Sequence, residues 1–199
     1  MNKKLPGPKL KANPTTRDKT SNYLKDWIYD VYPKLNNEYN CLLGDSIIEY
    51  LNHIPQLFDK HDWVINACGG DTTNHLLWRL LNIPKDKIIK KAIILIGIND
   101  IFKNKNILIS MENIKEIINN INGEIIFIKV LNCNPNYDNT PEYNLRVDEY
   151  NYLLTQLLYS YPKIKLIECE KLNENDFYDQ VHLNDSGNIK LINLIKKNM

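Results

Sequence analysis

Short apolar runs alternate with helical patterns along most of this chain. Five runs have the length and the β-branched content of strands that are buried on both faces; they cover residues 40–43, 63–67, 92–96, 124–131 and 164–168. Apolar residues recur at helical spacing between and after these runs, at about residues 46–57, 72–82, 110–121, 143–160 and 185–197. Because parallel neighbours need a crossover, the alternation predicts an α/β fold, a three-layer α/β/α sandwich with a central five-stranded parallel sheet.

The first 38 residues show a different pattern. Residues 1–20 combine prolines with lysines and show no periodicity, so they are interpreted as a basic arm that is solvated, with weak polyanion binding as the alternative. From Tyr23 to Tyr32 apolar residues return at helical spacing until Pro33 interrupts them, which predicts an amphipathic helix. We therefore expect residues 1–38 to form a basic arm and N-terminal helix, and residues 39–199 to form the main domain.

Composition narrows the classes of protein to consider. The chain is 43% hydrophobic and 25% charged, which is close to the globular average and allows a packed core without metals or disulfides. A formal net charge of +1 gives no general reason to expect a nucleic-acid partner. The start lacks the apolar core of a secretory signal and no apolar stretch approaches the roughly 20 residues needed to span a bilayer, so we expect a cytoplasmic protein without a membrane span. The four cysteines have no paired spacing and are expected to be reduced, buried thiols.

Polar residues follow three of the predicted strands, at the sheet edge where open α/β sheets bind ligands. Ser46 comes directly after Gly44 and Asp45, at the start of a predicted helix; a helix N-cap would explain the same residues. Gly70 stands in a turn that could direct a backbone N–H into the cleft, or simply connect a strand to a helix. Asn99 could donate its amide N–H to a developing oxyanion, or stabilise a turn.

A candidate base precedes the last predicted helix. Asp179 lies three residues before His182, so in a helical turn the carboxylate could hold the imidazole at Nδ1 and leave Nε2 as a base. Asp176 is an alternative partner that would need a looped path back to the imidazole. The remaining histidines lack this context and are interpreted as surface or helix-face residues: His53, His61 and His75.

Together a serine, two oxyanion donors and an Asp/His base are the groups needed for acyl transfer. The segments "LLGDSIIEYL", "VINACGGDTT", "ILIGINDIF" and "DQVHLNDSG", in this order, resemble the four blocks of the SGNH hydrolases, also called the GDSL esterase/lipase family. The resemblance covers roughly residues 39–198 and implies a flavodoxin-like SGNH hydrolase fold for the domain at 39–199. It implies that Ser46 is the nucleophile, His182 the base and Asp179 its orienting acid, with an oxyanion hole formed by the N–H groups of Ser46 and Gly70 and the amide of Asn99.

The function expected from these residues is a serine esterase that needs no metal or other cofactor. We expect a preference for short acyl groups such as acetyl on a soluble alcohol, including carbohydrates. Asp45, Asn132 and Cys133 are candidate substrate contacts; the last two lie in a segment that could equally be a turn-rich loop. A lysophospholipase or thioesterase of the same family is the alternative enzyme, and a non-catalytic binding or assembly module is the alternative of another class.

Overall fold

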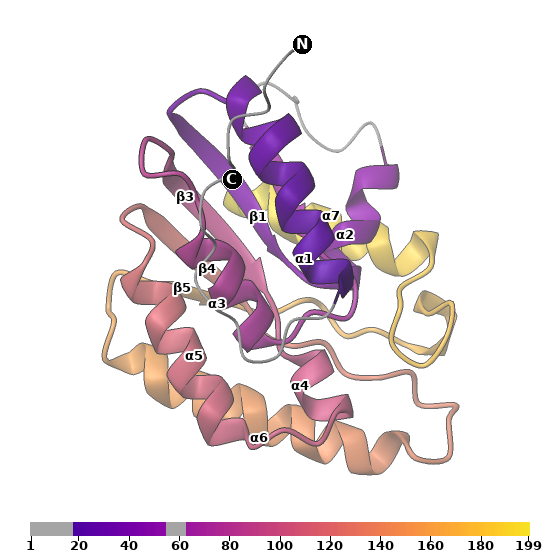
Figure 1. The fold of residues 1–199 in the computed structure, drawn as a ribbon. Helices are drawn as coiled ribbons and strands as arrows, with labels where there is room; N and C mark the ends of the chain where they lie inside the picture. Colours follow the sequence, from indigo (N-terminus) through magenta and orange to yellow (C-terminus); the bar gives the residue numbers. More distant parts are fainter. Residues whose placement is uncertain (1–17, 55–62) are drawn as a thin grey trace.

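The computed structural model describes residues 18–54 and 63–199 and confirms the predicted α/β fold with its five-stranded parallel sheet. The strand order is β2-β1-β3-β4-β5, and every neighbouring pair is parallel (Figure 1). The strands are β1 (Glu38–Gly44), β2 (Trp63–Ala67), β3 (Ile88–Leu95), β4 (Glu124–Ile128) and β5 (Lys165–Ile167). Because β1 lies between β2 and β3, the connections that leave these three strands start side by side.

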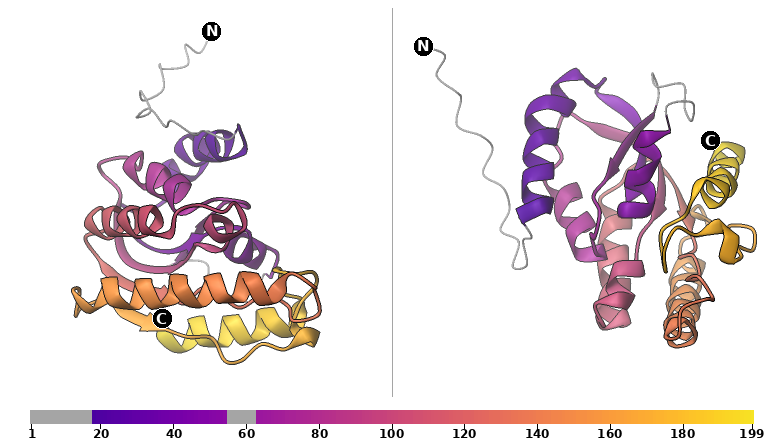
Figure 2. Two further views of the ribbon diagram at one scale, coloured as in Figure 1. Left: turned by 90° about the horizontal axis from the view of Figure 1, so that it is seen from below. Right: turned by 90° about the vertical axis from the view of Figure 1, so that its right-hand side faces the viewer.

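Helices cover both faces of the sheet. Figure 2 shows α1 and α3 on one side of the sheet and α7 on the other, and α3 packs against α5. The α-helices are α1 (Asp18–Asp26), α2 (Ser46–Glu49), α3 (Thr73–Leu81), α4 (Ile98–Phe102), α5 (Ile107–Asn119), α6 (Thr140–Tyr159) and α7 (Asp185–Asn198). The π-helix η1 (Trp27–Val31) and the 3-10 helices η2 (Tyr32–Lys34), η3 (Tyr50–His53) and η4 (Glu174–Asp176) complete the described elements.

The core forms where apolar residues of the strands face the helices on both sides. Leu42 and Leu43 of β1 and Ile93 and Ile94 of β3 are completely buried, as expected for strands covered on both faces. The predicted N-terminal helix is present, but the chain passes from α1 through a π-turn into the 3-10 turn that contains Pro33. Trp27 and Tyr32 of this segment join the same core cluster as the strands, and Tyr23 packs against it, whereas Tyr29 is exposed.

Several element boundaries differ from the expectation; the third strand, for example, begins at Ile88 rather than at residue 92. The helix predicted at 46–57 is described as α2 and η3, and residues 55–62, with His61, lie outside the described residues. Of the basic arm predicted at residues 1–20, residues 1–17 also lie outside them, whereas residues 18–20 belong to α1 and are helical. The strand predicted at 124–131 ends at Ile128 because the Asn151 side chain, rather than a neighbouring strand, pairs with the N–H and carbonyl of Val130. Helix α4 occupies a segment that was expected to be a turn.

Two further observations concern the described part of the chain. None of its helices has the length and apolar content that crossing a bilayer requires. All four cysteines are free; Cys41, Cys68 and Cys133 are buried, whereas Cys169 is partly exposed.

Candidate active site

Ser46 stands at the first position of α2, at the end of the sheet where β1 ends. The turn before it is tight: a Cβ on Gly44 would lie 2.5 Å from the carbonyl oxygen of Leu95, so only glycine fits without a shift. The Asp45 carboxylate caps the helix by accepting the N–H of Ile47 at 3.1 Å. The N-cap expected as an alternative is therefore present, but Asp45 provides it. The Ser46 hydroxyl bonds elsewhere, to His182.

The structure brings Ser46, His182 and Asp179 together in one hydrogen-bonded line. His182 Nε2 lies 3.0 Å from Ser46 Oγ, and His182 Nδ1 lies 2.7 Å from Asp179 Oδ2. With the proton on Nδ1 donated to Asp179, Nε2 is the acceptor for the Ser46 hydroxyl. This arrangement can move a proton from the serine to the imidazole.

Asp179 is held as an ionised carboxylate. Partial burial opposes ionisation, but Oδ1 accepts the backbone N–H groups of His182 at 2.7 Å and Val181 at 2.8 Å, and together with the imidazole they lower the pKa of Asp179 below its ordinary value. Asp176, the alternative partner, instead contacts Lys190 at 2.8 Å and Ser186 at 2.9 Å. Asp179 is therefore the carboxylate that faces the imidazole.

The loop that carries Asp179 is anchored by a residue that the sequence interpretation missed. Asn134, in the loop after β4, donates its backbone N–H to the Gln180 carbonyl at 2.9 Å and its side-chain amide to the Asp179 carbonyl at 3.3 Å. The Gln180 side chain in turn donates to Asn139. No periodicity marks Asn134, because its partners lie about 45 residues away in the chain.

Gly70 and Asn99 follow the two strands that flank β1. Gly44 is in register with Ala67 of β2 and with Leu95 of β3, so the three connecting segments leave the sheet at the same level. Gly70 has φ 77°, a conformation that favours glycine, and Asn99 Nδ2 donates to the carbonyl of Asp71 at 3.1 Å. The Glu49 carboxylate of α2 accepts the N–H of Gly69 at 2.8 Å. These contacts place the candidate oxyanion donors beside the Ser46 turn, and their catalytic role stays a prediction.

A buried arginine supports this end of the sheet. Arg79 of α3 is 1% exposed; it donates to Asp71 at 2.9 Å and to the carbonyl of Gly44 at 3.0 Å, and it also bonds Asn66. The ring of Tyr23 in α1 lies 5.6 Å from the guanidinium carbon. One cation therefore connects the N-terminal helix with the turn before Ser46 and with the residue after Gly70.

The other histidines lie away from this line. His75 is buried on α3, where Nδ1 lies 3.1 Å from the backbone nitrogen and from the hydroxyl of Thr72, closing a capping box. His53 is exposed at the end of η3 and contacts the ring of Tyr50. His75 therefore lies on a helix face and His53 at the surface, in agreement with the interpretation of these two residues.

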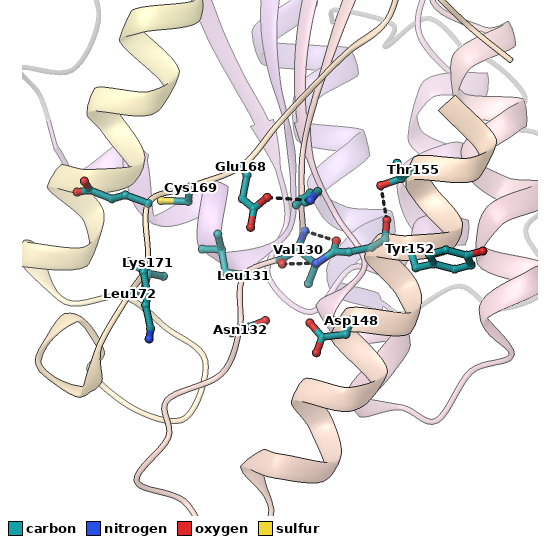
Figure 3. Close-up of a pocket in the computed structure, with 13 residues that line it drawn as sticks. Val130, Leu131, Asn132, Asp148, Tyr152, Thr155, Glu168, Cys169, Lys171 and Leu172 are labelled. Atoms are coloured by element: carbon teal, nitrogen blue, oxygen red, sulfur yellow. Dashed lines mark hydrogen bonds and ion pairs between the residues drawn. The ribbon is translucent and has the colours of Figure 1, made fainter. Parts of the chain in front are cut away.

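The three candidate substrate contacts lie in different environments. Asp45 is 1% exposed and Cys133 is buried with its N–H bonded to Asn144. Asn132 is exposed and lines a cavity of about 610 Å³ between the loop after β4, helix α6 and the segment after β5 (Figure 3). Ser46, Asp179 and His182 do not line that cavity. Contact between these three residues and a substrate stays a prediction.

Asp45 makes stability depend on pH. Burial raises the pKa of Asp45 to about 7, and the charges of Asp71 and Asp100 act in the same direction. Because the folded state then holds a proton that the unfolded state has lost, the free energy of unfolding falls as pH rises from about 4 to about 7. The Asp45→Asn variant keeps an oxygen that can cap α2, but it has no carboxyl group to titrate and so loses this contribution to the pH dependence of the free energy of unfolding. We expect urea titrations to show the variant gaining about 2–3 kcal/mol on wild type between about pH 5 and about pH 8; parallel pH profiles would contradict the assignment.

Comparison with known proteins agrees with the geometry. Residues 42–188 match the GDSL-like lipase/acylhydrolase family. Platelet-activating factor acetylhydrolase IB subunit alpha2 of Gallus gallus is 25% identical over 162 residues, which are 75% of this chain and 70% of that protein. The structure of a GDSL-like lipase from Bacteroides thetaiotaomicron superposes with a TM-score of 0.74 at 18% identity, over 90% of this chain and 97% of the other. An acetylxylan esterase, Axe2 of Geobacillus stearothermophilus, superposes with a TM-score of 0.63 at 14% identity, over 82% and 94% of the two chains.

The family match covers most of the described domain, and it spans Ser46, Gly70, Asn99, Asp179 and His182. The predicted resemblance is therefore confirmed. This chain belongs to the GDSL-like lipase/acylhydrolase family and is an ester-bond hydrolase.

Proposed function

We propose that the protein is a serine esterase in which Ser46 is the nucleophile, His182 the general base and Asp179 the residue that orients and stabilises the imidazolium. The observation that carries the proposal is the continuous line from Asp179 Oδ2 to His182 Nδ1, at 2.7 Å, and from His182 Nε2 to Ser46 Oγ, at 3.0 Å. A hydroxyl is a weak nucleophile unless a base takes its proton as it attacks. Both distances lie within the range that such proton transfer requires.

The reaction proceeds through an acyl-enzyme. Ser46 Oγ attacks the ester carbonyl while its proton passes to His182, and the resulting oxyanion accepts hydrogen bonds from the N–H groups of Ser46 and Gly70 and from the Asn99 amide. His182 then gives the proton to the alcohol oxygen as the carbon–oxygen bond breaks. A water molecule then attacks the acyl carbon while its proton passes to His182, and His182 returns this proton to Ser46 Oγ as the bond between Oγ and the acyl carbon breaks and the acid is released. Asn99 has two amide hydrogens, so it can keep its bond to Asp71 and still donate to the oxyanion.

We infer that the preferred substrates carry short acyl groups, such as acetyl, on soluble alcohols that include carbohydrates. The names of two similar proteins support this choice, since one is an acetylhydrolase and one an acetylxylan esterase.

A chain-length series tests this preference. We expect kcat/KM for p-nitrophenyl acetate to exceed that for the octanoyl and palmitoyl esters by about tenfold or more, since an acyl site that fits acetyl closely must distort to admit the additional methylenes. Initial rates below the solubility limit of each ester provide the measurement. A preference for the long esters would instead favour a lysophospholipase or long-chain thioesterase.

A further inference from the structure

A cavity of about 770 Å³ opens beside the candidate base. His182 and Asp179 form one part of its lining, and Tyr50, Tyr178, Leu183 and Asp185 form most of the rest. It shares no lining residue with the cavity at Asn132. Neither tyrosine takes part in the proton transfer among Ser46, His182 and Asp179, so we asked what else their side chains could bind in this cavity.

Proton transfer determines which part of an ester lies near this cavity. His182 receives the serine proton at Nε2 and must return it to the alcohol oxygen, so that oxygen has to come within hydrogen-bond distance of Nε2. The remainder of the alcohol then lies beside the imidazole. The cavity lined by His182 is therefore the space for the alcohol rather than for the acyl group.

Two aromatic side chains line this space from opposite segments of the chain. Tyr50 begins η3, four residues after Ser46, so its side chain lies on the same side of the helical turn as the serine. Tyr178 directly precedes Asp179, and its backbone N–H is bonded to the carbonyl of His182 at 2.8 Å. Tyr50 and Tyr178 are 43% and 83% exposed respectively, so each presents aromatic surface to the cavity, although the Tyr50 ring also contacts that of His53. Their exposure beside a base is explained if a ring of the substrate packs on them.

The charge of the lining excludes one class of alcohol. Its carboxylates come from Asp179 and Asp185, and none of the described residues that line it is a lysine or arginine. A phosphate group in this space would lie near the Asp185 carboxylate and the paired Asp179 and His182, and no lysine or arginine among the described lining residues would offset its charge. An uncharged alcohol meets no such penalty.

We propose that this cavity is an alcohol subsite in which Tyr50 and Tyr178 bind the ring of an uncharged cyclic alcohol, and in which Asp185 helps to exclude phosphorylated alcohols. The proposal rests on the esterase function proposed above and narrows its substrate class. Sugar rings and aryl rings share the chemistry that the two tyrosines recognise, so the test includes both.

Matched acetyl esters test the subsite. The wild-type protein is assayed with acetylated glucose, acetylated glucose 6-phosphate, phenyl acetate and ethyl acetate. We expect kcat/KM for the glucose ester to exceed that for its phosphorylated counterpart by about tenfold or more, and Asp185→Asn to narrow this gap about threefold. Equal kcat/KM values for the two glucose esters would overturn the charge argument. The variants Tyr50→Ala and Tyr178→Ala show which ring the subsite binds. If they lose more kcat/KM for the glucose ester than for phenyl acetate, the preferred alcohol is a sugar; if they lose more for phenyl acetate, it is an aryl alcohol.

The tyrosines are tested by a ratio, which separates ring binding from a general loss of activity. Tyr50→Ala and Tyr178→Ala should each lower the ratio of kcat/KM for the ring esters to that for ethyl acetate about five- to tenfold, mainly through KM, whereas Tyr→Phe at either position should retain it. Tyr159→Ala, at a 90% exposed ring on α6, is the control. An equal loss for ring and ethyl esters would show a structural role and end the proposal.

A binding measurement separates this proposal from the esterase function. Saturation-transfer NMR on Ser46→Ala should detect glucose or phenol more strongly than glucose 6-phosphate, and Tyr178→Ala in the same background should weaken that signal. If wild type hydrolyses none of the esters but this selective binding is observed, the esterase function is wrong and the subsite remains. If esters are hydrolysed but no selective binding is found, the subsite is wrong and the esterase function remains.

Discussion

Ser46→Ala is expected to remove ester hydrolysis almost completely, with a loss in kcat of about 10⁴-fold or more. The reason is that Ser46 Oγ, 3.0 Å from His182 Nε2, is the atom that would form the acyl-enzyme, and alanine offers no atom to replace it. The fold should be unaffected because Asp45, not Ser46, caps α2. Hydrolysis of p-nitrophenyl acetate gives the rate, and circular dichroism and thermal unfolding confirm the fold.

Ser160→Ala is the matched control for this experiment. Ser160 is exposed at the end of α6, and no hydrogen bond joins it to the Asp179–His182–Ser46 line. We expect wild-type kinetics from this variant. A Ser46→Ala protein that still hydrolyses acetyl esters at a rate similar to Ser160→Ala would exclude Ser46 as the nucleophile.

Arg79→Met is expected to cause the largest loss of stability, about 3–5 kcal/mol in the free energy of unfolding. Methionine fills much of the same volume, but it removes the cation that lies 2.9 Å from the buried Asp71 carboxylate and the donor to the Gly44 carbonyl. A buried carboxylate that loses its cation retains the full cost of its desolvation. Urea unfolding followed by tryptophan fluorescence measures the change.

Arg146→Met provides the comparison for Arg79→Met. Arg146 also donates to backbone carbonyls, those of Ile101 and Lys105, but it is only partly buried and contacts no carboxylate through a described ion pair. We expect a loss of about 1 kcal/mol or less for this variant. If Arg79→Met is too unstable to titrate, Arg79→Lys retains the charge and should show a smaller loss. Equal effects of Arg79→Met and Arg146→Met would show that burial of the Arg79–Asp71 pair is unimportant.

The parts of the fold that were predictable are those encoded locally. Runs such as "AIILI" have the length and β-branched content of buried strands, and the helical patterns between them indicate that neighbouring strands run parallel, since parallel neighbours need a crossover. Asp179 and His182 were predictable as a pair because they are close in sequence, but the helical turn expected for them is wrong: residues 179–182 are not helical, and Asp179 Oδ1 joins the two residues by accepting the backbone N–H groups of Val181 and His182. Ser46, Gly70 and Asn99 were predictable as candidates because each follows a strand, although only the sheet order shows that β2, β1 and β3 are neighbours.

The parts that were not predictable depend on long-range packing. A single arginine on a helix is ordinarily solvent-exposed, and nothing near Arg79 in sequence reveals that Gly44, Asn66 and Tyr23 enclose it. Asp45 was a candidate substrate contact, yet it is 1% exposed and close enough to Asp71 and Asp100, which follow the neighbouring strands, for their charges to raise its pKa. The role proposed for Tyr178 likewise depends on a cavity that forms only where η3 meets the segment before α7 and the start of that helix.

The most direct test of the account is covalent labelling with a fluorophosphonate probe, because the probe reacts only with a serine that a base has activated. Intact-mass and peptide analysis locate the adduct. The account predicts a single adduct on Ser46 of the wild-type protein, formed about 10³-fold more slowly or not at all in His182→Ala. A folded wild-type protein that never reacts, or that reacts at another residue, would contradict the claim that His182 activates Ser46.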